Sequence, residues 1–185
     1  MAKPRASTIQ QRFGFQDGDL KTPKHDEMML WLDSNLLKIV GAMAGSWDNG
    51  RDAARKEGCP EELLSEEHNR TLDRRTWEYP IVDRKYGGAK YVIGFVDLWA
   101  SCTAPELRRW ESGEWHWGNP TKYFYFEVKS TIPSLGELIR QIRMYQEYIE
   151  THLSGAFYIV SPDARFKDAL RSQGIGFVHY PSGEV

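Results

Sequence analysis

The sequence predicts an α/β domain in which a mixed central sheet is flanked by helices. Two aromatic and β-branched segments, 77–82 and 90–99, lie on either side of Gly87-Gly88, a third covers 123–130, and an amphipathic segment follows it. Such residues are typical of strands, and glycines between two strand-like runs indicate a β-hairpin. The predicted order along the chain is helix, three strands, helix, strand, helix, strand.

Composition narrows the class of protein. The chain has 185 residues, 41% of them hydrophobic and 27% charged, which favours one soluble domain. A net charge of −2 argues against binding polyanions through bulk charge, although local clustering sets the field that a ligand meets. The two cysteines, Cys59 and Cys102, are too few for a four-thiolate site, so we expect no iron–sulfur cluster. Without a membrane-length apolar run or a signal peptide, the sequence predicts a cytoplasmic protein.

The first predicted helix begins at Thr22-Pro23, with Thr22 as N-cap and Pro23 at the first helical position. One turn back along its apolar stripe lies His25, whereas Glu27 falls nearer the flank. The stripe consists of Met28, Met29, Leu32, Leu36, Ile39 and Val40.

Three further segments complete the N-terminal part. Residues 1–21 are polar and are interpreted as an N-terminal arm, which leaves 22–185 as a single domain. Glycine, asparagine and proline in 45–60 predict an irregular connection. Residues 61–71 are predicted to form a short, charged, solvated helix.

The predicted hairpin carries the first acidic candidate. Pro80 cannot donate a ladder hydrogen bond, which places the first strand at a sheet edge. Because side chains alternate along a strand, Tyr91, Ile93, Phe95 and Asp97 are predicted to share a face. A carboxylate therefore ends an apolar face.

The third strand repeats this pattern. Glu127 and Lys129 are predicted to project from one face, and Phe126 and Val128 from the other. Charges at the end of an apolar strand are costly to bury unless a partner or a ligand uses them. The alternative is an ordinary salt bridge between Asp97 and Lys129, with Glu127 solvated at the strand end.

Residues 103–121 form an insertion between the second and third strands. The segment contains Trp110, Trp115 and Trp117 among basic residues. These aromatic side chains either stack on nucleic-acid bases or pack against the body of the protein. Both interpretations stay open at the level of sequence.

The second long helix is predicted to begin at Pro133-Ser134 and to run to about His152. Gln141 and Tyr145 are four residues apart and therefore neighbours on one helix face. The remaining predicted elements are a strand over 156–160, a helix over 163–172 and a strand over 176–180.

This order, with Asp97 ending the second strand and Glu127-Val128-Lys129 in the third, resembles the PD-(D/E)XK nuclease superfamily. Gln141 and Tyr145 look like the Gln-x-x-x-Tyr element of its RecB-like branch. The resemblance covers a core of about 75–160 and implies a restriction-endonuclease-like αβββαβ fold.

The resemblance implies a Mg²⁺ or Mn²⁺ site in which the metal ligands are the Asp97 and Glu127 carboxylates and the Val128 carbonyl. Hard divalent cations prefer such oxygen ligands. The resemblance also implies one further residue near the metal, contributed by the first helix. This residue is either Glu27 or His25.

The same resemblance implies roles for the other residues. Lys129 would lie beside the attacking water, and Gln141 and Tyr145 would position substrate or Lys129. The implied activity is a metal-dependent deoxyribonuclease, either an exonuclease or a structure-selective endonuclease.

Two alternatives share this fold. One is a site-specific endonuclease of restriction or mobile-element type that reads sequence through 103–121, and the other is a nucleic-acid-binding module that does not cut. The expected partners are DNA, a separate helicase or recombination or defence protein, or a second copy of the chain, without a membrane.

Overall fold

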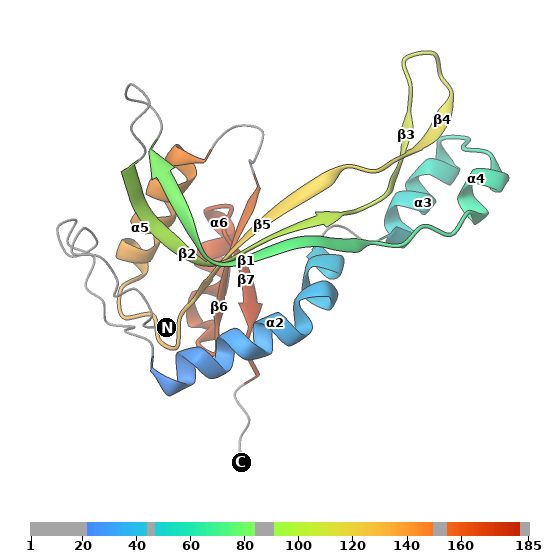
Figure 1. Ribbon diagram of the computed structural model, residues 1–185. Coiled ribbons are helices and arrows are strands. Elements are labelled where there is room, and N and C mark those ends of the chain that lie inside the picture. Colours follow the sequence, from blue (N-terminus) through green and yellow to red (C-terminus); the bar gives the residue numbers. More distant parts are fainter. Residues whose placement is uncertain (1–21, 44–46, 84–90, 150–154, 182–185) are drawn as a thin grey trace.

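A computed structural model describes residues 22–43, 47–83, 91–149 and 155–181. Its central sheet has the strand order β1-β2-β5-β6-β7 (Figure 1). The first three strands pair antiparallel and the last three pair parallel, which confirms the predicted mixed sheet. The strands are β1 (Thr71–Asp83), β2 (Tyr91–Thr103), β5 (Thr121–Val128), β6 (Ala156–Ser161) and β7 (Gly176–His179).

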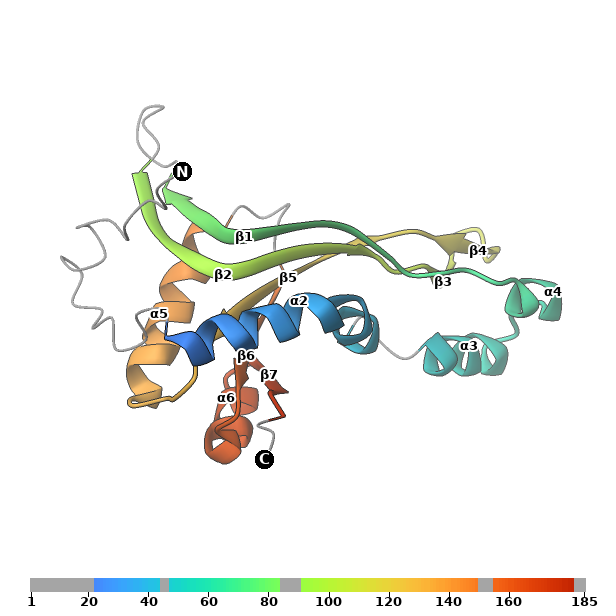
Figure 2. The ribbon, with the colours of Figure 1, turned by 60° about the horizontal axis from the view of Figure 1, so that its bottom comes forward.

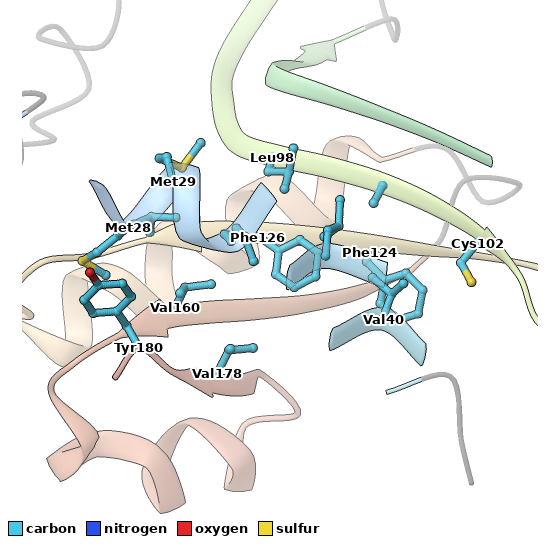
Figure 3. Close-up of a cluster of buried hydrophobic side chains, with 14 residues drawn as sticks. Met28, Met29, Val40, Leu98, Cys102, Phe124, Phe126, Val160, Val178 and Tyr180 are labelled. Atoms are coloured by element: carbon cyan, nitrogen blue, oxygen red, sulfur yellow. The ribbon is translucent and has the colours of Figure 1, made fainter. Parts of the chain in front are cut away.

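Helices cover both faces of this sheet. Helix α2 (Pro23–Met43) packs on one face over a cluster that includes Leu98, Phe124 and Phe126 (Figure 3). Helices α5 (Leu135–Tyr148) and α6 (Lys167–Ser172), the latter preceded by the 3-10 turn η2 (Ala164–Phe166), pack on the other face, where Tyr125 lies. None of the described helices is long and apolar enough to cross a membrane.

Both long helices begin where the sequence predicts. The Thr22 hydroxyl accepts the His25 N–H at 3.2 Å, and the Ser134 hydroxyl accepts the Glu137 N–H at 3.4 Å. Such caps satisfy amide groups that lack a partner inside the helix. Helix α5 ends at Tyr148, before the predicted end near His152, which lies outside the described residues.

The predicted hairpin is also confirmed, and β1 with Pro80 is the edge strand of the sheet. Both strands are longer than predicted, because mostly polar residues extend β1 back to Thr71 and small residues extend β2 forward to Thr103. The predicted N-terminal arm 1–21 and the turn at Gly87-Gly88 lie outside the described residues.

The long strands lead into a part of the molecule that projects from the core, here called the protrusion (Figures 1 and 2). It consists of α3 (Trp47–Lys56), α4 (Glu61–Ser65) and a hairpin of β3 (Glu106–Arg109) and β4 (Trp115–Gly118). The irregular connection predicted for 45–60 is therefore wrong, because the α3 residue Ala54 is buried in a small cluster with Cys59 and Leu64. The helix predicted over 61–71 is too long, since it ends at Ser65.

Candidate active site

Strands β2 and β5 separate at Asp97. Their ladder runs from Thr103 opposite Thr121 to Leu98 opposite Phe126, which is its last pair. One residue further along β2, a side chain replaces the backbone partner, since Asp97 Oδ2 accepts the Val128 N–H at 2.7 Å. The strands thus form a fork, with Asp97 on one branch and Val128 on the other.

A backbone feature on β1 lies directly opposite this fork. The pairs Trp77–Leu98 and Tyr79–Val96 place Glu78 across from Asp97. Glu78 has φ 48°, and among the described residues it is the one non-glycine residue with positive φ. Left-handed backbone is unfavourable for L-residues and bends a strand away from regular pairing. We infer that it contributes to the strong curvature of β1 and β2 (Figure 2).

The same bend changes the side-chain pattern of β2. Val96 packs in the cluster beside α5, whereas Leu98 packs in the cluster beneath α2. In a regular strand these two residues would share a face. The prediction that side chains alternate without interruption along β2 to Asp97 is therefore wrong. Asp97 lies between Val96 and Leu98, which point to opposite faces of the sheet.

Glu127 on β5 is buried, with 4% of its surface exposed. Its Oε1 lies 3.1 Å from Lys129 Nζ and accepts a hydrogen bond of 2.9 Å from Gln141 Nε2. Its Oε2 is buried and has no hydrogen-bond partner among the described residues. The alternative in which Glu127 is solvated is wrong, because the side chain is buried and only one of its oxygens has a hydrogen-bond partner among the described residues.

A second layer connects Glu127 to α5 and β2. Gln141 Nε2 also donates to Tyr145 Oη at 3.0 Å, and Tyr145 Oη donates to the Phe95 carbonyl at 3.2 Å. Gly94 makes room for this ring, because a Cβ atom there would lie 2.7 Å from Tyr145 Oη. The predicted neighbours on α5 thus orient the carboxylate.

Burial changes the proton affinity of these groups. It raises the pKa of Glu127 to about 7, a shift that Lys129 opposes and Asp97 reinforces. It also raises the pKa of Tyr145 above its ordinary value, so the hydroxyl stays a hydrogen-bond donor at neutral pH. A buried carboxyl with a raised pKa and a specific charged neighbour is typical of functional sites.

The structure separates the two helix candidates. His25 is buried, and its Nε2 lies 3.5 Å from Asp97 Oδ1, an interaction that raises the pKa of His25 above its usual value. Glu27 is exposed and accepts a hydrogen bond of 2.8 Å from Tyr180 Oη. Of the two residues, His25 is the one brought to Asp97.

The oxygen atoms at the fork are of the type that hard divalent cations prefer. Among the described residues, no group of three or more His, Cys, Asp or Glu side chains is arranged to hold a metal. Mg²⁺ commonly uses only one or two carboxylates and keeps several waters. Asp97 and the partnerless Glu127 Oε2 can supply these carboxylates. The Val128 carbonyl points to the same side as its N–H, which faces Asp97.

The structure therefore gathers the predicted residues where β2 and β5 separate and leaves Glu27 apart. The prediction that Asp97 ends the second strand is wrong, because β2 continues on both sides of it, from Tyr91 to Thr103. Sequence reasoning missed two contributors, Gly94 and Glu78. A lone glycine inside a strand pattern signals a close approach and could have identified Gly94, whereas nothing in the sequence marks the backbone of Glu78.

Comparison of the chain with protein-family models, curated proteins and solved structures finds no match. The gathered residues are Asp97, Glu127, Val128, Lys129, Gln141, Tyr145 and His25.

Proposed function

We propose that this protein is a metal-dependent nuclease that hydrolyses phosphodiester bonds in DNA, on a restriction-endonuclease-like fold of the RecB-like type. The observation that carries the proposal is Glu127 Oε2, a buried carboxylate oxygen without a partner among the described residues. It belongs to a side chain in contact with Lys129. Leaving such an oxygen unsatisfied costs free energy, which a bound cation would recover.

Asp97, Glu127 and the Val128 carbonyl would hold Mg²⁺ or Mn²⁺. When bound, the ion neutralises phosphate charge and lowers the pKa of a coordinated water. The chain itself fixes the ligands, because the Val128 N–H holds Asp97 and the Gln141 amide holds Glu127. His25 restrains the second oxygen of Asp97.

Lys129 supplies a positive charge beside the metal-binding carboxylate, with Nζ 3.1 Å from Glu127 Oε1. Its ammonium group can orient the attacking water and stabilise the negative charge that develops on the phosphate. Tyr145 does not touch the reacting atoms in this scheme. It positions Gln141 against Glu127 by anchoring the amide to the Phe95 carbonyl.

Cleavage of labelled single- and double-stranded DNA tests the proposal. We expect Mg²⁺ or Mn²⁺ to support cleavage, and excess chelator or Glu127→Gln to abolish it. Glu137→Gln makes the same change at an exposed carboxylate of α5 and is expected to leave cleavage intact. Cleavage that persists in Glu127→Gln or in chelator would contradict the proposal.

The products of the same reaction distinguish the related functions. Progressive shortening indicates an exonuclease, and cuts at strand junctions indicate a structure-selective endonuclease. Discrete fragments from a plasmid indicate the site-specific alternative. DNA binding without any cleavage indicates the non-cutting module on the same fold.

A further inference from the structure

The protrusion contains a cavity that is separate from the proposed active site. It has a volume of about 430 Å³ and lies between α3 and the β3–β4 hairpin. None of its lining residues belongs to the group at the fork. Its size falls within the roughly 300–1,000 Å³ of small-molecule sites, so it can accept one unit of a larger ligand.

The charges around this cavity favour an anion. Its lining includes four basic and two acidic side chains. Lys122 and Arg108 both approach the Glu106 carboxylate, whereas Arg109 Nε donates to a neutral acceptor, the Gly113 carbonyl, at 3.1 Å. The basic lining residues are Arg51, Arg70, Arg109 and Lys122, and the acidic ones are Glu57 and Glu106.

The wall of the cavity contains aromatic and guanidinium planes, of which Trp117 is also packed against His68, with 4.3 Å between the ring centres. The Arg109 guanidinium carbon lies 6.0 Å from the centre of the Trp115 ring, and that of Arg51 lies 5.5 Å from the Trp117 ring. Trp117 Nε1 donates to the Leu63 carbonyl at 3.0 Å, which fixes the indole in place. Indole and guanidinium planes are surfaces on which unstacked bases bind.

We propose that this cavity binds a nucleotide unit of single-stranded DNA, with Arg109 facing a phosphate and the region around Trp115 taking an unstacked base. In a duplex the bases are paired and stacked, so they cannot enter a cavity of this kind. The inference extends the proposed function, because the bound strand would be its substrate.

Strand β5 connects the cavity to the proposed active site. Lys122 lines the cavity and Glu127 lies at the fork on the same strand. At about 3.3 Å per residue, the two positions are roughly 17 Å apart along β5. The cavity and the fork are therefore close enough for one bound DNA strand to reach both of them.

Fluorescence anisotropy of a labelled oligothymidylate tests the inference on the full chain in excess chelator, where cleavage plays no part. We expect Arg109→Gln to weaken binding about tenfold and to reduce its salt dependence by about one phosphate contact. Arg108→Gln is the matched control, because this neighbouring exposed residue pairs with Glu106 and does not line the cavity. It is expected to bind within about twofold of the wild type.

Two further variants separate stacking from charge. Arg109→Lys keeps the positive charge but loses the planar guanidinium group. Its affinity for the oligothymidylate should therefore fall between those of the wild type and Arg109→Gln. Trp110→Ala removes an exposed tryptophan outside the cavity and should leave binding unchanged. The same strand annealed to its complement should bind with at least fivefold lower affinity than the single strand.

Equal affinities for Arg109→Gln and Arg108→Gln, equal affinities for single strand and duplex, or no binding of the oligothymidylate would overturn the inference. Loss of binding in Arg109→Gln, in a protein that cuts no DNA, would support this site and reject the nuclease proposal. Cleavage of DNA together with an unchanged affinity in Arg109→Gln would support the nuclease proposal and reject this site.

Discussion

The fork and the protrusion both present charged side chains, but they do so in opposite settings. At the fork, Glu127 is buried and its contacts are fixed on one oxygen only. In the protrusion, Arg109 is exposed at the edge of an open cavity and bonds a backbone carbonyl. A buried charge without full compensation reduces the stability of the fold. The arrangement at the fork therefore reduces the stability of the fold, whereas the exposed charge of Arg109 in the protrusion costs little folding free energy.

The largest expected effect separates chemistry from binding. We expect Lys129→Ala to lower the rate of DNA cleavage by about 10³-fold, because it removes the ammonium group beside Glu127, the carboxylate proposed to bind the metal. DNA affinity measured in chelator should stay close to that of the wild type. Arg109→Gln should show its main effect on affinity instead.

This contrast between cleavage at the fork and binding at the protrusion would be contradicted if Lys129→Ala reduced DNA affinity and cleavage rate in parallel. Such a result would place Lys129 in DNA binding and would remove the functional difference between the two regions. Single-turnover kinetics at saturating enzyme provide the measurement, since they report the rate of the bound complex.

The second expectation concerns pH and the cost of burying Glu127. Its pKa rises from 4.5 in the unfolded chain to about 7 in the metal-free fold, so folding takes up a proton between these values. Stability should fall as pH rises from about 4.5 to about 7, by on the order of a few kcal/mol. The pKa of His25 is also raised, so its contribution is present below 6.5 and is lost as pH rises through its folded value.

Denaturant unfolding in chelator at pH 5, 6, 7 and 8 measures this dependence. The wild type should lose more stability over the range than Glu127→Gln, which has no proton to release at that position. Added Mg²⁺ should stabilise the wild type most at the upper end of the range, where the carboxylate is ionised. A wild-type profile parallel to that of Glu127→Gln would contradict the expected cost.

The third expectation compares two glycines, one from each region. Gly94→Ala places a methyl group against Tyr145 in a packed site, and should destabilise the fold by about 1–3 kcal/mol. Gly50→Ala in α3 meets no atom within 4 Å and should instead stabilise the fold by about 0.5–1 kcal/mol. Chemical denaturation of both variants gives the two values.

Opposite signs for the two substitutions would support a rigid site and a permissive protrusion. If Gly94→Ala were neutral, Tyr145 would not be held where the hydrogen bonds to Gln141 and Phe95 require it.

The smallest expected effect tests the bend opposite Asp97. Because Glu78 has positive φ, Glu78→Gly should be about 1 kcal/mol more stable than Glu78→Ala. Both substitutions remove the same side-chain contacts, so the difference isolates the backbone. In an ordinary strand the order is reversed, and a more stable alanine variant would show that the bend is not strained.

Much of the core could be predicted because its patterns are strong and local. The stripe of α5 and the β1–β2 hairpin were visible in periodicity and turn residues, and so was the acid near the end of β5, Glu127. Helical spacing made Gln141 and Tyr145 neighbours, and the resemblance implied that both line the site; in the structure Gln141 bonds Glu127 and Tyr145 bonds Gln141. Between His25 and Glu27 the sequence did not decide, because extending the inward stripe of α2 favoured His25 whereas residue type favoured Glu27.

The protrusion and the bend could not be predicted in the same way. Helix α3 contains Asn49 and Gly50, which are poor helix formers, and it forms because Ala54 packs against Cys59 and Leu64. The start of β1 is polar because the strand there lies away from the core. The conformation of Glu78 depends on tertiary structure that no local pattern encodes.

The most direct test of the central claim is anomalous diffraction from crystals grown with Mn²⁺. We expect a manganese peak in contact with Glu127 Oε2 and the Asp97 carboxylate, and its loss in crystals of Glu127→Gln. Manganese bound elsewhere, or an unchanged peak in Glu127→Gln, would contradict a metal-dependent site at the fork.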